Sequence, residues 1–227
     1  MKLSKSLLIV IGLSATVTCA VAQSGSITLF NSAVTTFHTN TIALGGASGN
    51  ALTPGGVLYY ELLTAPSTVT TIDGSLQNLF SSTWSDTGIS ATNGGLPGRM
   101  HGAQITAALN WNQGVQQAFI IVGWSANEGT SWSQVSSELL GAALVPQNGS
   151  YYWTGGGLTP GGVIGATIVG SAIAAPNGNP GTQLFGPNPG QVQSTTELYV
   201  SVPEPGAVAL AGLGAAALLI RKKRKGS

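Results

Sequence analysis

Short runs in which apolar and polar residues alternate dominate residues 23–201, and clusters of Gly, Pro, Asn and Ser separate these runs. Alternation with a period of two, in segments rich in Thr, Val, Ile and Tyr, is typical of β-strands. We therefore expect an all-β domain of the β-sandwich or jelly-roll type. The predicted strands are Gly25–Asn31, Val57–Leu63, Ile105–Trp111, Val115–Trp124, Val163–Val169 and Thr195–Val202.

Two segments depart from simple alternation. Val115–Trp124 becomes apolar on both faces from Ala118 onward, which predicts a strand buried on both sides. One short segment, Trp132–Leu140, has a helical pattern. Ser131 precedes it, and Gln134 lies three residues after Ser131, as in a capping box. The Gly- and Pro-rich stretches predict long loops at Ala43–Gly56, Ser81–Gly102 and Pro176–Gly190.

A six-residue sequence, LTPGGV, occurs twice, as Leu52–Val57 and as Leu158–Val163. Both copies precede a predicted strand, so we interpret them as a shared Pro-Gly turn at the start of a strand. Two related β-modules are the alternative interpretation.

The first 22 residues have the organisation of a secretory signal peptide. Two lysines precede the apolar stretch Leu7–Leu13, and Ala20 and Ala22 form a small-x-small cleavage site before Gln23. The only cysteine, Cys19, lies within this segment, so cleavage leaves a mature chain without thiols or disulfides. Acylation of Cys19 as a lipoprotein is the alternative.

The C-terminal 26 residues contain three parts. An uncharged apolar run, Gly206–Ile220, predicts a transmembrane helix of roughly 22 Å, short against a bilayer core of about 30 Å. A basic end favours placement of that end in the cytoplasm. The residues before the run are Val202, Pro203, Glu204 and Pro205, and those after it are Arg221, Lys222, Lys223, Arg224 and Lys225.

This order of motif, apolar run and basic end resembles the PEP-CTERM sorting signal of Gram-negative bacteria that make exopolysaccharide. The resemblance covers residues 202–227 and implies recognition by an exosortase, a membrane-embedded cysteine protease-transpeptidase. It also implies an intermediate held transiently at the inner membrane, followed by release to the cell envelope or extracellular matrix. Retention as an uncleaved single-pass anchor is the alternative. The predicted organisation is thus a signal peptide (1–22), a β-rich extracytoplasmic domain (23–201) and a sorting signal (202–227).

Charge is almost absent from the predicted extracytoplasmic domain. Arg99 is its only basic residue against six acidic ones, which gives a net charge of −5. Without a basic surface to neutralise phosphates, we exclude nucleic acid as a partner.

Residue patterns for catalysis or for binding metals and cofactors are missing from the sequence, so we expect no enzyme and no cofactor. Glu128 and Glu138 are the best pair for glycoside hydrolysis, but their positions in a loop and on a helix give no sign that they converge. Aromatic rings stack on sugars, which makes Trp132 and Trp153, both expected near polar loops, the candidate glycan contacts.

We therefore predict a structural or adhesive protein of an exopolysaccharide matrix. A carbohydrate-binding module that uses exposed Trp and Tyr is the alternative, and a glycoside hydrolase is less favoured.

Overall fold

The computed structural model describes residues 23–40, 58–72, 83–102, 106–147, 150–177 and 179–202. The predicted signal peptide, the whole Ala43–Gly56 segment, the first LTPGGV copy and the sorting signal from Pro203 onward lie outside these residues. The described strands are β1 (Ser24–Thr28), β2 (Phe37–Thr39), β3 (Leu58–Pro66), β4 (Ser85–Asn93), β5 (Met100–Gly102), β6 (Thr106–Asn112), β7 (Gln116–Ser125), β8 (Ala142–Gln147), β9 (Ser150–Gly155), β10 (Val163–Ala166), β11 (Gly170–Ile173), β12 (Thr182–Gln183) and β13 (Thr196–Val200).

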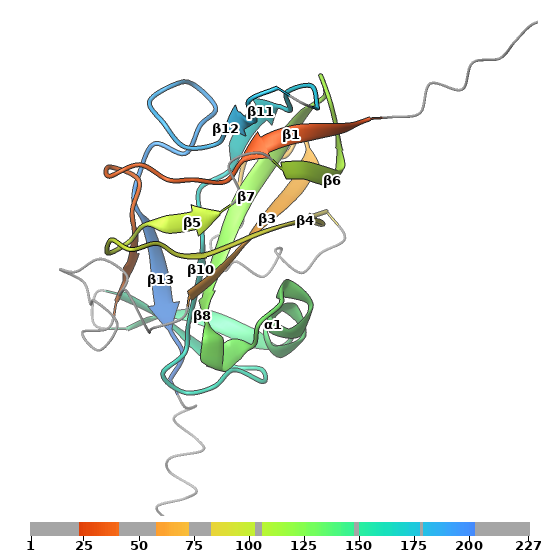
Figure 1. Ribbon diagram of the computed structural model, residues 1–227. Helices are drawn as coiled ribbons and strands as arrows, with labels where there is room; N and C mark the ends of the chain where they lie inside the picture. The colour runs from red at the N-terminus through yellow and green to blue at the C-terminus, as the bar shows by residue number, and fades with distance from the viewer. Residues whose placement is uncertain are drawn as a thin grey trace, which may run out of the picture.

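These strands form a large curled sheet, a small sheet and a hairpin (Figure 1). The large sheet has the order β2-β13-β10-β7-β3-β4-β5, and β11 continues the pairing along β7. The small sheet has the order β12-β1-β6, and β8 pairs with β9. Two pairings are parallel, β1 with β12 and β2 with β13, which departs from the antiparallel pairing throughout a jelly roll.

The long strands β3 and β7 form the centre of the molecule, and β7 is buried on both faces as its sequence predicts. On one face, Phe119 and Ile121 pack against the small sheet, in a cluster that includes Ile27 and Trp111. On the other face, Ala118, Ile120, Val122 and Trp124 pack under the helix and the hairpin. Every residue from Ala118 to Ser125 is buried.

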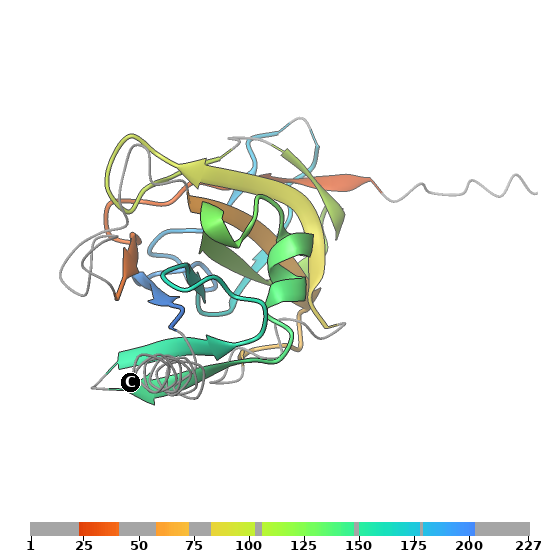
Figure 2. The ribbon, with the colours of Figure 1, turned by 90° about the horizontal axis from the view of Figure 1, so that it is seen from below.

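The single described α-helix, α1 (Trp132–Glu138), begins where the sequence predicts it. Ser131 is its N-cap, and the Ser131 side chain accepts a hydrogen bond from the Gln134 N–H. The Gln134 side chain reaches back to the N–H of Thr130 at 2.9 Å, one residue earlier than in a capping box. The 3₁₀ helix η3 (Ala126–Glu128) precedes α1, and both lie under the curve of β4 (Figure 2).

The all-β prediction is confirmed, because about half of the described residues lie in strands and α1 is one short helix. The expectation of a long loop over Ser81–Gly102 is wrong, since β4 and β5 occupy most of it. In β4 the buried positions Thr87, Ile89 and Ala91 alternate with exposed ones. Thr87 is polar and Ala91 is small, so the sequence shows this alternation only weakly. The second LTPGGV copy forms the predicted turn, closed by a hydrogen bond from the Gly162 N–H to the Thr159 carbonyl.

Candidate functional site

A pocket of about 650 Å³ opens on the face of the large sheet that α1 partly covers. Strand β3 contributes Tyr59 and Glu61, and β4 contributes Asp86 together with the hydroxyl groups of Ser90 and Thr92. The start of α1 and the end of β7 complete the wall. A volume of this size falls within the range of roughly 300–1,000 Å³ that is usual for small-molecule sites.

Three aromatic rings stand side by side along one wall of the pocket. The rings of Tyr59 and Trp124 are stacked, with centroids 6.1 Å apart and planes 26° apart. Trp132 lies beyond Trp124, at 6.0 Å and 45°. The Trp124 Nε1–H donates to the Gly129 carbonyl at 3.0 Å, which fixes that ring in place. Trp124 is only 1% exposed and Trp132 9%, so these two indoles support the wall from within. The half-buried Tyr59 is the ring of the three that is best placed to pack against a sugar.

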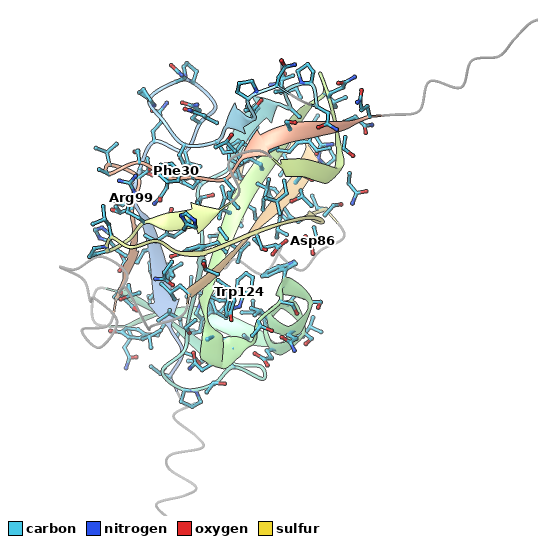
Figure 3. The ribbon with its side chains drawn as sticks, viewed as in Figure 1. Phe30, Asp86, Arg99 and Trp124 are labelled. Carbon is cyan, nitrogen blue, oxygen red and sulfur yellow. The ribbon has the colours of Figure 1, made fainter. Side chains whose placement is uncertain are left out.

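Two carboxyl groups meet in the same pocket. Glu61 is only 7% exposed, and its side chain hydrogen-bonds to that of Asp86. Burial raises the pKa of Glu61 to about 8, and the hydrogen bond and negative charge of Asp86 act in the same direction. At neutral pH Glu61 is therefore mostly protonated and donates to Asp86. Figure 3 shows Asp86 and Trp124 on the side of the sheet toward α1.

A β-bulge brings these two acids together. Glu61 pairs with Ser90, but after a register shift Leu63 pairs with Asp86. An unshifted register would place Gly88 opposite Leu63 and move Asp86 farther along the strand. Gly88 has a φ of 68°, and its N–H donates to Asp86 Oδ1 at 2.7 Å. The glycine thus allows the bulge, and the bulge positions the carboxyl group.

A second acid pair lies in the interior. Contrary to the sequence-based expectation, Glu128 and Glu138 do converge, because their side chains hydrogen-bond to each other. Burial raises the pKa of the fully buried Glu128 to about 7, and Glu128 Oε2 accepts from the Thr159 N–H at 2.9 Å. Glycosidase carboxyls stand about 5–10 Å apart, so this contact is too close for that chemistry.

The candidate glycan contacts have different positions. Trp153 on β9 is fully buried, and its Nε1–H donates to the Ile164 carbonyl, so the prediction that it contacts a ligand is wrong. Its burial is required because β9 covers the second hydrophobic cluster. Trp132 is also buried, at 9% exposure, yet it lines the pocket wall. Proximity to Gly-rich or polar sequence did not predict exposure.

The chain leaves the domain beside the second LTPGGV turn. The Ser201 N–H donates to the Gly162 carbonyl at 2.7 Å, and the Ser201 carbonyl accepts from the Gly161 N–H at 2.8 Å. The Val202 N–H donates to the Trp153 carbonyl at 2.9 Å. The backbone is therefore held against the domain up to the residue that precedes Pro203.

Residues 201–225 match the protein family described as the PEP-CTERM protein-sorting motif. The tail carries a PEP-CTERM sorting motif. This motif marks an exported protein that is processed at a membrane, in general by an exosortase. No curated protein and no solved structure matches the chain.

The PEP-CTERM residues from Pro203 onward, including the predicted transmembrane helix, lie outside the described part. Within the described part, no helix is long and apolar enough to cross a membrane. No group of three or more His, Cys, Asp or Glu side chains among the described residues is arranged to hold a metal ion. His101 lines the pocket, whereas His38 lies on β2, where it pairs in register with Glu197.

Sequence reasoning missed the main features of the pocket: Tyr59, Glu61, Asp86 and the wall position of Trp124. The alternation of buried and exposed positions in β4 could have indicated that Asp86 faces outward, because Asp86, Ser90 and Thr92 share the exposed face of that strand. No pattern in the sequence indicated the contact between Glu61 and Asp86, because the two residues are 25 positions apart and a bulge sets their register.

Proposed function

We propose that this PEP-CTERM protein is an adhesive component of an exopolysaccharide matrix, and that it holds polysaccharide in the pocket between β3, β4 and α1. The observation that carries the proposal is the combination, in one cavity, of a carboxyl pair with the half-buried Tyr59 ring, which two buried indoles support. Sugars need both an apolar face to stack on and directional acceptors for their hydroxyl groups.

The composition of the domain supports the same proposal. Arg99 is the only Lys or Arg between residues 23 and 201, and its guanidinium lies 5.3 Å from the centroid of the Phe30 ring. Figure 3 shows these two side chains together, away from Asp86. Ser and Thr hydroxyl groups therefore supply much of the polar lining of the pocket, alongside the two acids.

We do not propose hydrolysis. The carboxyls of Glu61 and Asp86, like those of Glu128 and Glu138, are in hydrogen-bonding contact. Retaining glycosidases need about 5–5.5 Å between carboxyls and inverting ones more, so neither pair leaves room for a glycosidic bond and a nucleophile or water.

A pocket-filling variant tests the proposal. Ser90 lines the pocket and is exposed on β4, so Ser90→Trp should occupy the cavity without disturbing the core. Ser85→Trp, on the same strand but outside the lining, is the matched control. The full chain in detergent should bind members of a glycan array, Ser85→Trp should bind the same members, and Ser90→Trp should lose them. Equal binding by both variants would overturn the assignment of this pocket.

A further inference from the structure

The charge in the pocket is unbalanced within the protein itself. Glu61 and Asp86 both line the cavity, and none of its described lining residues is Lys or Arg. The other titratable side chains in the lining are Tyr59 and Tyr60 on β3 and His101 on β5. Two acids therefore lie in one cavity whose described lining has neither Lys nor Arg to balance them.

We propose that the pocket selects a sugar with a free primary amine, such as a de-N-acetylated hexosamine unit of a polysaccharide. This inference rests on the proposed glycan-binding function and names the substrate class of that site. The ammonium group supplies the positive charge that the carboxyl pair lacks, and a hydrogen bond from N⁺–H to a carboxylate is stronger than one between neutral groups.

The aromatic wall favours the same ligand. The face of a Tyr ring attracts cations as well as C–H groups, and the half-buried Tyr59, stacked on the buried Trp124, lines the same cavity as the acid pair. An N-acetyl group would replace the ammonium by a neutral amide, which cannot balance the charge of the carboxyl pair.

Binding of an ammonium group should release a proton from the protein. With no ligand, Glu61 keeps its proton at pH 6–7, because its burial and the facing Asp86 disfavour a second negative charge. A cation between the two groups reverses that preference. The proton passes to the buffer, and the observed heat of binding then depends on the ionisation enthalpy of the buffer.

The test compares three tetrasaccharides in calorimetric titrations of the full chain at pH 6: an oligomer of glucosamine, one of N-acetylglucosamine and one of glucose. We expect the glucosamine oligomer to bind at least about tenfold more tightly than the other two, with proton release seen in two buffers. Equal affinities for all three would overturn the amine selectivity and leave the glycan-binding function standing. Binding of none of the three at millimolar concentration would overturn both.

Two variants test whether the amine selectivity and the proton release depend on Glu61 and Asp86. Asp86→Asn changes an exposed side chain and Glu61→Gln a buried one, so the first keeps the test valid if the second does not fold. Each should reduce the affinity for the glucosamine oligomer at least about tenfold and abolish proton release. Glu197→Gln neutralises an acid on β13, outside this pocket, and should change neither. Undiminished selectivity in Asp86→Asn would contradict the proposal.

Discussion

The carboxyl groups of Glu61 and Asp86 hydrogen-bond to each other in the wall of an aromatic pocket, because a bulge at Gly88 shifts the register between β3 and β4. This relationship joins the fold to the proposed function. A bulge in a strand beside a binding site is a common way to redirect one side chain.

The bulge should require its glycine. Gly88→Ala places a Cβ at a φ of 68°, a conformation that costs side chains about 1–2 kcal/mol. We expect lower stability and, if the strand relaxes to the unshifted register, loss of the raised pKa of Glu61. Carboxyl titration of the variant by NMR measures the pKa of Glu61. An unchanged titration of Glu61 would contradict the role given to the bulge.

The aromatic wall predicts a loss of affinity with little loss of fold. Tyr59→Leu removes the ring that stacks on Trp124 from a half-buried position. We expect about a tenfold weaker affinity for glycan, in line with the energy of one aromatic stacking contact. Tyr151→Leu, which removes an exposed ring on β9 outside this pocket, is the control and should bind as the parent does.

The interior acid pair predicts a pH-dependent stability. The pKa of Glu128 is raised to about 7 in the folded chain, from an ordinary value of 4.5 in the unfolded one. The folded state binds the extra proton between these values, so its stability is greatest below pH 4.5 and falls as the pH rises to 7.

Glu128→Gln removes this dependence, because an amide stays neutral and still offers an oxygen to the Thr159 N–H. The variant should match the parent near pH 4 and exceed it at pH 8, by on the order of 1–3 kcal/mol. Urea denaturation at both pH values measures the difference. A gain of equal size at both would mean that ionisation of Glu128 is not the cause.

The buried indole of Trp153 predicts a structural role. Trp153→Ala would leave a cavity and remove the hydrogen bond to the Ile164 carbonyl, which together should lower the free energy of unfolding by about 3–5 kcal/mol. Thermal denaturation gives the value. A loss below 1 kcal/mol would contradict the close packing of β9 on the second hydrophobic cluster.

The attachment of the tail predicts the kinetics of processing. Ser201 and Val202 are held by three backbone hydrogen bonds, and Pro203-Glu204-Pro205 of the PEP-CTERM match follows them directly. A flexible Gly-Ser spacer inserted between Val202 and Pro203 should make the motif more accessible and accelerate conversion by the exosortase severalfold. Intact-mass analysis after a pulse of synthesis follows the conversion, and a spacer of equal length within Ala43–Gly56 is the control. An unchanged rate would show that access is not limiting.

The sequence predicted those elements whose signals are local. The apolar run of β7 can only be buried on both faces, and Ser131 has the side chain that a helix start needs. It did not predict β4, where Thr, Ser and Gly weaken the alternation. The pocket could not be found in this way, because pairing Glu61 with Asp86 depends on strand register. Register is set by tertiary packing and by a bulge rather than by residue type.

Tryptophan provides the most direct test of the glycan-binding pocket. All five Trp residues lie between residues 23 and 201, but only Trp124 and Trp132 line the pocket. The full chain labelled with 5-fluorotryptophan, assigned with single Trp→Phe variants, can be titrated with the glucosamine tetrasaccharide and observed by fluorine NMR. We predict saturable shifts of Trp124 and Trp132, which support the pocket wall, with Trp111 and Trp153, outside its lining, unchanged. Binding that leaves the Trp124 and Trp132 resonances in place would contradict the assignment of this pocket as the glycan site.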